Sequence, residues 1–166
     1  NIRDLYLSTL EKLSKDFICA RYNPASYLLN PEEFNAKYGE LFNEINIQQV
    51  QRNLAQFIQR LLVMRFESSK AAFKSTLTSI LNSYENIKKW WKKGYVPIKK
   101  SGYLPDPDDD EIQETLDEIN SISDEPIDVD KIKKKALPFS KDLFSDKYIV
   151  SVDHDIALLR EIYNDW

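Results

Sequence analysis

Apolar side chains recur at helical spacing in the first part of the chain. An amphipathic helix is predicted over about residues 2–20, where apolar positions three and four apart share one face. It is expected to end before Pro24, because the residue that precedes a proline avoids helical dihedral angles. A second helix is predicted over 31–44, with Asn30 as its cap and Pro31 in its first turn. The inward positions are Ile2, Leu5, Leu10, Leu13 and Phe17 in the first helix and Phe34, Tyr38, Leu41 and Phe42 in the second.

The most regular pattern is an apolar stripe that continues through residues 47–93. Asn46, with Gln49 three residues later, marks its start as a capping box. The stripe keeps its phase across Ser68-Ser69, where a turn would be expected to reset it. The sequence therefore favours one long helix, straight or bent, over about 47–93 that ends at Gly94, and two helices that meet at Ser68-Ser69 are the alternative. The stripe consists of Val50, Leu54, Phe57, Ile58, Leu61, Leu62, Phe66, Phe73, Leu77, Ile80, Leu81, Tyr84, Ile87 and Trp91.

Beyond Gly94 the helical pattern is interrupted. Glycine and proline occur repeatedly in residues 94–110, which predicts a loop, and the Leu137-Pro138-Phe139 stretch predicts a break. Short helices are predicted over 108–120 and 128–135, residues 148–150 are expected to be extended, and a final helix to begin near Ser151 or Asp153. The predicted all-α organisation is a helical bundle over 1–100, an acidic segment of loops and short helices over 101–136, and a C-terminal helical segment over 137–166 that packs back on the bundle.

Composition supports the all-α prediction and disfavours several kinds of chemistry. The chain has three glycines in 166 residues, which is few for a protein that builds phosphate loops or tight strand turns. The single Cys19 excludes an internal disulfide and a multi-cysteine metal site, and it is expected to be a small buried hydrophobic residue. No apolar run is long enough to span a membrane. A reducing, intracellular location is expected by default.

The only histidine lies in the cluster Asp153-His154-Asp155. Adjacent residues on a helix point about 100° apart, so these three side chains cannot converge on one ion. The two acids are better explained as the first turn of a helix, where they suit the positive end of its dipole. The acids of Asp106 to Asp110 alternate as in a calcium loop, but the required later glycine and glutamate are missing. We therefore expect no catalytic residues, no metal and no cofactor.

The feature of the sequence that most suggests a specific chemistry is a basic and aromatic segment over residues 87–103. Its lysines surround Trp90, Trp91 and Tyr95, and lysines that neutralise phosphates beside stacking aromatics are typical of a nucleic-acid surface. The alternative is a solvated helix end, where cations suit the negative end of the dipole. Trp90 lies off the apolar stripe and therefore needs a neighbour or a partner. The candidate nucleic-acid contacts are Lys88, Lys89, Lys92, Lys93, Lys99 and Lys100.

The C-terminal helix resembles the first helix of SANT, Myb or SLIDE domains, in which an acidic start precedes paired leucines and a later aromatic residue. Residues 45–62 resemble the last SANT helix, and the order of the segments resembles the region after the motor in CHD- and ISWI-type chromatin remodellers. The residues that carry the resemblance are Asp155, Leu158, Leu159, Ile162 and Trp166 at the end of the chain, Ile47, Val50, Phe57 and Leu61 in the middle, and the Tyr22-Asn23-Pro24 and Leu28-Leu29 tracts.

Two departures from that family shift the expected function. Tyr148 or Val150 stands where the first SANT helix has a tryptophan. The net charge is −4, whereas DNA-reading members are basic, and an acidic module would repel phosphate.

The resemblance thus implies a non-catalytic accessory module of a larger nuclear protein that docks another subunit of a chromatin-remodelling or silencing complex. A DNA- or nucleosome-binding module that uses residues 88–100 is the alternative, and a helical scaffold outside the nucleus is a third interpretation. No membrane and no small-molecule substrate are expected. The expected partner contacts are Trp90 and Tyr95, as exposed aromatics, and Tyr163 and Trp166, as packing anchors.

Overall fold

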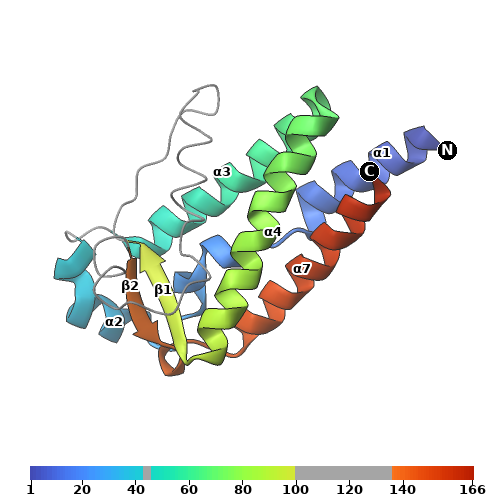
Figure 1. Ribbon diagram of the computed structural model, residues 1–166. Coiled ribbons are helices and arrows are strands. Elements are labelled where there is room, and N and C mark those ends of the chain that lie inside the picture. Colours follow the sequence, from blue (N-terminus) through green and yellow to red (C-terminus); the bar gives the residue numbers. More distant parts are fainter. Residues whose placement is uncertain (43–45, 100–135) are drawn as a thin grey trace.

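The structure is a computed structural model that describes residues 1–42, 46–99 and 136–166 (Figure 1). The predicted all-α class is confirmed, because this part of the chain forms a helical bundle with one small sheet. Turns of 3-10 and π geometry connect its elements. The helices are α1 (Ile2–Glu11), α2 (Pro31–Tyr38), α3 (Ile47–Ser68), α4 (Lys70–Lys92) and α7 (Lys147–Asp165), and the strands are β1 (Tyr95–Lys99) and β2 (Ala136–Ser140).

The single helix expected over 47–93 is instead two helices, which is the alternative that the sequence left open. Ser69 is extended, with φ −157° and ψ 120°, and its hydroxyl accepts a hydrogen bond from the Ala72 N–H (3.2 Å). It therefore ends α3 and caps α4. α4 then runs back along α3 as a hairpin (Figure 1). The stripe keeps its phase because both helices bury it in one core, where the rings of Phe66 and Phe73 meet edge to face at 5.0 Å.

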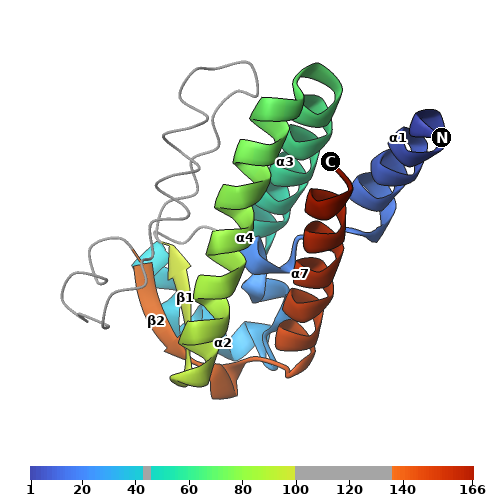
Figure 2. The same ribbon diagram turned by 45° about the vertical axis from the view of Figure 1, so that its right-hand side comes forward.

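α4 is the central helix of the bundle, since it packs against both α3 and α7 (Figures 1 and 2). Its Leu77, Ile80 and Tyr84 are completely buried. The start of α7 corrects the expectation that residues 148–150 are extended and that the last helix begins near Ser151 or Asp153. α7 begins at Lys147, because burial of a helical face outweighs the preference of β-branched residues for strands.

The N-terminal helix is shorter than the predicted 2–20. α1 ends at Glu11, a π-helical turn follows over Lys12–Asp16, and two 3-10 turns cover Ala20–Tyr22 and Pro24–Tyr27. The chain leaves the helix at Phe17, which is extended (φ −73°, ψ 116°), and Cys19 then has a left-handed conformation with a φ of 62°. α2 likewise ends at Tyr38 and continues as a 3-10 turn over Gly39–Phe42, while the rest of the predicted 31–44 helix lies outside the described residues.

A two-stranded antiparallel sheet replaces the loop expected after Gly94 and the break expected at 137–139. Tyr95 pairs with Ser140, and Pro97 pairs with Pro138. The Lys141 N–H donates to the Gly94 carbonyl (2.9 Å), so the alternation of an antiparallel ladder leaves both prolines at positions that make no ladder bond. A missing N–H costs nothing there, which is why prolines are tolerated. The helices predicted over 108–120 and 128–135 lie outside the described residues.

No helix among the described residues is long and apolar enough to cross a bilayer.

Candidate functional site

The end of α4, the start of β1 and the first turn of α7 meet at one end of the molecule (Figure 1). Gly94 has a φ of 97°, which favours glycine, and turns the chain from α4 into β1. The ring of Trp91 on α4 lies 6.0 Å from the ring of Tyr148 on α7. We call this region the basic end, and define it by its lysines: Lys88, Lys89, Lys92, Lys93, Lys141 and Lys147.

The predicted lysines differ in how far they are neutralised. The Nζ atom of Lys88 lies 2.9 Å from an Asp153 carboxylate oxygen, in a pair that water reaches and salt screens. Lys92 and Lys93 are exposed and form no ion pair within residues 1–42, 46–99 and 136–166. They are therefore the strongest candidates for contact with an anionic partner. Of the other predicted lysines, Lys89 is exposed, Lys99 belongs to β1 by its backbone, and Lys100 lies outside the described residues.

Sequence reasoning missed two lysines that the fold adds to the basic end. Lys141 follows β2, and its Nζ atom lies 5.7 Å from the ring centroid of Trp91, as a cation–π contact. Lys147 opens α7. No local signal marks either residue, because only the pairing of β1 with β2 and the packing of α7 on α4 bring them there. Among the described residues, Asp142, Asp146 and Asp153 place carboxylates in this region.

The aromatic residues of the predicted segment lie in different environments. Trp90 was expected to be an exposed contact, but it is buried and only 4% exposed. α4 has more than one covered face at this end, since β1 turns back against it, and a position off the main stripe is therefore not exposed. Tyr95 is 42% exposed and remains a candidate contact.

The two C-terminal aromatics lie at the opposite end of the bundle. The indole N–H of Trp166 donates to the Thr9 hydroxyl (3.0 Å), and its ring meets that of Phe66 edge to face at 5.2 Å. Tyr163 is partly exposed, and the Lys74 ammonium lies 4.3 Å from its ring centroid. Both residues therefore pack against other helices of this chain, and neither is part of the basic end.

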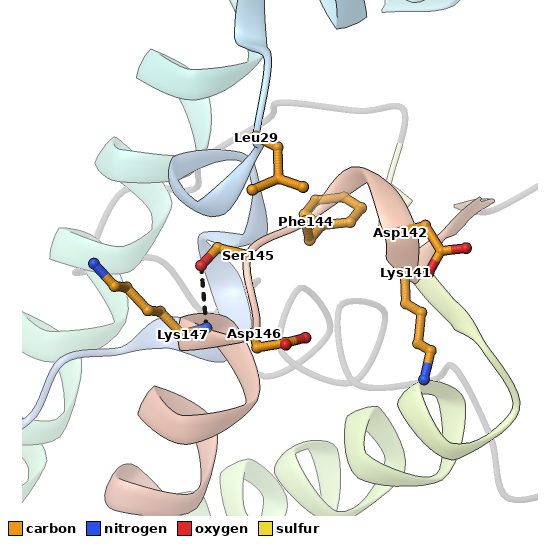
Figure 3. Close-up of a pocket in the computed structure, with 7 residues that line it drawn as sticks. All are labelled: Leu29, Lys141, Asp142, Phe144, Ser145, Asp146 and Lys147. Atoms are coloured by element: carbon orange, nitrogen blue, oxygen red, sulfur yellow. Dashed lines mark hydrogen bonds between the residues drawn. The ribbon is translucent and has the colours of Figure 1, made fainter.

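An open pocket of about 440 Å³ lies beside the basic end (Figure 3). The segment that joins β2 to α7 forms most of it, and Leu29 contributes from the N-terminal part of the chain. The backbone of these two segments is joined, because the Leu29 N–H donates to the Leu143 carbonyl (2.9 Å) and the Ser145 N–H donates to the Tyr27 carbonyl (2.7 Å). Its lining residues are Leu29, Lys141, Asp142, Phe144, Ser145, Asp146 and Lys147.

The Asp153-His154-Asp155 cluster lies well inside α7, so the expectation that its acids begin a helix is wrong. The three side chains diverge. Asp153 pairs with Lys88, and the Nε2 atom of His154 lies 3.0 Å from the Asp16 carbonyl oxygen. Asp155 is completely buried. Within the described residues, no group of three or more His, Cys, Asp or Glu side chains is arranged to hold a metal ion.

Asp155 ties three parts of the chain together inside the core. Its carboxylate accepts hydrogen bonds from the N–H groups of Ile18 and Ala20 (2.9 Å each) and from the Tyr84 hydroxyl (2.7 Å). The left-handed conformation of Cys19 turns the two N–H groups toward one acceptor. The sequence held a signal for this role, because Asp155 shares the buried face of α7 with apolar residues. We call this arrangement the Asp155 tie.

Burial governs the acid–base properties of the Asp155 tie. Desolvation raises the pKa of Asp155 above its ordinary value, although the hydrogen bonds from Ala20, Tyr84 and Ile18 oppose the shift. Desolvation first, and then the charge of Asp155, raise the pKa of the Cys19 thiol well above its usual range. Burial likewise raises the pKa of Tyr84. A thiol that stays protonated is a poor nucleophile, so this geometry favours a structural role.

Comparison of the chain with protein-family models, with curated proteins and with solved structures gives no match. The fold and the site define the described part as a helical bundle with a small sheet, a basic end and a buried carboxylate tie. The resemblance of residues 155–166 to a SANT or SLIDE helix stays a prediction.

Proposed function

We propose that this chain is a non-catalytic docking module that binds a helix of another protein subunit, as an accessory part of a nuclear chromatin-remodelling or silencing complex. The observation that supports docking is a gradient of exposure along one face of α1 and of the π-helical turn that follows it. Ile2, Tyr6, Thr9 and Leu13 share that face, at spacings of four, three and four residues. Ile2 is 76% exposed, whereas Thr9 and Leu13 are completely buried.

The bundle covers only the C-terminal part of this α1 face. The ring of Tyr6 stacks on Phe66 at 5.0 Å, and Thr9 accepts the hydrogen bond from Trp166. The first turn of α1 projects away from the bundle beside the C-terminal end of α7 (Figures 1 and 2). That turn is formed without neighbours, because the Asn1 side chain caps it by accepting from the Arg3 N–H (2.7 Å).

Helix-in-groove recognition commonly uses an ordered helix with an uncovered apolar face. A partner helix that extended the apolar face of α1 would bury Ile2 and the part of Leu5 that remains accessible. Full burial of an isoleucine side chain is worth about 1.5–3 kcal/mol, enough for one anchor of a larger interface. The nuclear part of the proposal is supported by the resemblance of the C-terminal helix to SANT and SLIDE helices.

Site-specific cross-linking in nuclear extract tests the docking proposal. A photoreactive benzoylphenylalanine at position 2 should cross-link to a defined partner protein, whereas the same group at Ser8, which is exposed on another face of α1, should not. The substitution Ile2→Ser should weaken competition by unlabelled protein about tenfold or more, because it removes one anchor. Equal cross-linking from positions 2 and 8 would refute docking through this face.

A nucleic-acid contact is the second candidate function. It is favoured by the exposed Lys92 and Lys93 beside Tyr95, with Lys141 added by the fold. If duplex DNA binds here, the logarithm of its binding constant should fall linearly with the logarithm of salt concentration. Changing Lys92 and Lys93 to Glu should reduce that slope by about 2. Lys70, exposed at the far end of α4, is the matched control.

A further inference from the structure

We propose that the pocket beside the basic end binds a short extended peptide with an aliphatic and aromatic anchor at its centre and acidic residues on each side of it. The proposal deepens the docking function above, on which it rests for its biological meaning, and it concerns a different surface. Three observations support the proposal: the apolar wall of the pocket, the directions in which the two lysines of the pocket extend, and the position of the pocket beside the basic end.

The pocket has an apolar wall, of which Leu29 is the accessible part. Leu29 is 66% exposed at its edge, although it is held in place by its backbone bond to Leu143. Phe144 lies next to it but is only 3% exposed, and its ring lies 6.4 Å from that of Tyr148. Figure 3 shows Leu29 and Phe144 side by side on one wall of the pocket. A pocket of about 440 Å³ has room for a large side chain and the main chain that carries it.

Two lysines frame that wall on opposite sides. Lys147 extends to one side, and Lys141 extends to the other, toward α4 (Figure 3). Acidic residues on either side of an anchor would meet one ammonium group each. Lys93 adds positive charge on the side of Lys141, since the Lys141 N–H is bonded to the carbonyl of the next residue, Gly94. The lysine side chains of this rim are exposed, so they can reorient to a ligand.

The same pocket is a poor site for a nucleic-acid backbone. The carboxylates of Asp142 and Asp146 line it beside the lysines, and Asp146 lies between the two lysines in Figure 3. A phosphate at every nucleotide would approach these carboxylates and be repelled. A peptide presents its charges only at chosen side chains, and its main-chain N–H groups can donate to Asp146. The mixture of charges therefore favours a peptide over a duplex.

The test is an amide-resolved NMR titration of the full chain with the acetylated and amidated hexapeptide EDLFED. We expect chemical-shift changes at Leu29 and at residues 141–147, with a dissociation constant on the order of 0.1–1 mM for so small a ligand. The peptides KKLFKK and EDSSED should bind at least tenfold more weakly, because the first reverses the charges and the second lacks the anchor. Equal binding of either control would overturn the proposal.

Variants distinguish this pocket from the other surfaces. The double substitution K141E/K147E should weaken EDLFED about tenfold or more, and K70E, a charge reversal at the far end of α4, should leave it unchanged. Ile2→Ser should also leave it unchanged, so failure of docking through α1 and failure of the pocket proposal give different results. Binding that is unaffected by K141E/K147E, or displacement of the peptide by a 12-base-pair duplex at the same amides, would overturn the proposal.

Discussion

Replacement of Asp155 is the sharpest test of how this fold is held together. The Asp155→Ala substitution leaves three donors without their acceptor: the N–H groups of Ile18 and Ala20 and the hydroxyl of Tyr84. Each buried donor left unsatisfied, here the Ala20 N–H and the Tyr84 hydroxyl, costs about 1–3 kcal/mol, and the part-buried Ile18 N–H costs less. Removal of the carboxylate also relieves the cost of burying it, which the raised pKa reveals. We expect a net loss of about 3 kcal/mol in the free energy of unfolding.

The Asp155→Asn substitution separates charge from shape. The amide keeps one acceptor oxygen but places an NH₂ group against one of the donors, so about 1–2 kcal/mol should be lost. Asp153→Asn is the matched control on the same helix. Its side chain is about half exposed and pairs with Lys88, and its loss should cost less than about 1 kcal/mol. Urea unfolding at pH 7, followed by tryptophan fluorescence, measures all three variants against the unsubstituted chain.

The pH dependence of that difference has a defined sign. Because desolvation raises the pKa of Asp155 above its ordinary value of 3.8, the folded state binds a proton that the unfolded state has already released. Stability from protonated Asp155 is therefore fully present below pH 3.8 and is lost as the pH rises through the folded-state pKa. A protonated carboxyl group can donate to the Tyr84 hydroxyl, which then becomes the acceptor. The advantage of the unsubstituted chain over Asp155→Asn should thus be larger near pH 4 than at pH 7.

Two results would refute this reasoning. One is an Asp155→Ala variant within about 1 kcal/mol of the unsubstituted chain, which would mean that other groups satisfy the three donors. The other is an advantage over Asp155→Asn that grows from pH 4 to pH 7. That result would mean that hydrogen bonding to the ionised form outweighs desolvation.

Three smaller perturbations test other parts of the fold. Cys19, buried and with a raised pKa, should react with a thiol reagent at pH 8 only after unfolding, and fast labelling of the native chain would contradict this. Ser69→Ala should cost about 1 kcal/mol in urea unfolding, because it removes the cap on Ala72, whereas exposed Ser68→Ala should be close to neutral; equal losses would contradict the capping role. Gly94→Ala should cost about 1–2 kcal/mol through its positive φ alone, since an added Cβ meets nothing within 4 Å, and an unchanged melting temperature would show that the turn relaxes.

Sequence patterns predict those parts of the fold that depend on neighbouring residues. Asn30 and Asn46 were assigned as helix caps, and both are confirmed, since they accept from the N–H groups of Glu33 (3.0 Å) and Gln49 (3.1 Å). The apolar stripe located α3 and α4 because its period reports which face is buried. The stripe could not show where the chain turns back between the two helices, because two antiparallel helices that share one core can keep the same phase. One serine with an extended backbone decides that point.

The parts that were missed depend on contacts between distant residues. β1 and β2 each contain a proline, which reads locally as a break, and only their mutual register shows that Pro97 and Pro138 occupy non-bonded positions. The basic end was found in part, because Lys88 to Lys93 are consecutive or nearly so. Lys141 and Lys147 join it only through the sheet and α7. Trp90 was misassigned for the same reason, since the strand that packs back on α4 was not foreseen.

The two proposed docking surfaces lie at opposite ends of α7, and this arrangement yields a last prediction. α7 has 19 residues, so at 1.5 Å per residue it separates the pocket at its first turn from the contact between Trp166 and Thr9 by about 28 Å. Sites so far apart, with no shared side chain, should respond independently. Ile2→Ser should affect only cross-linking at α1, and K141E/K147E only the peptide.

The Asp155 tie lies between these surfaces and fixes the N-terminal segment against both α4 and α7. When heat lowers the folded fraction, Asp155→Ala should therefore weaken both binding readouts together and at a lower temperature than the unsubstituted chain, and both should recover on cooling. Cooling should not restore binding in a variant that lacks a contact residue, because its weaker binding does not depend on the fraction of the chain that is folded. Loss of one readout alone in Asp155→Ala would show that the tie positions a single surface and does not hold the whole bundle.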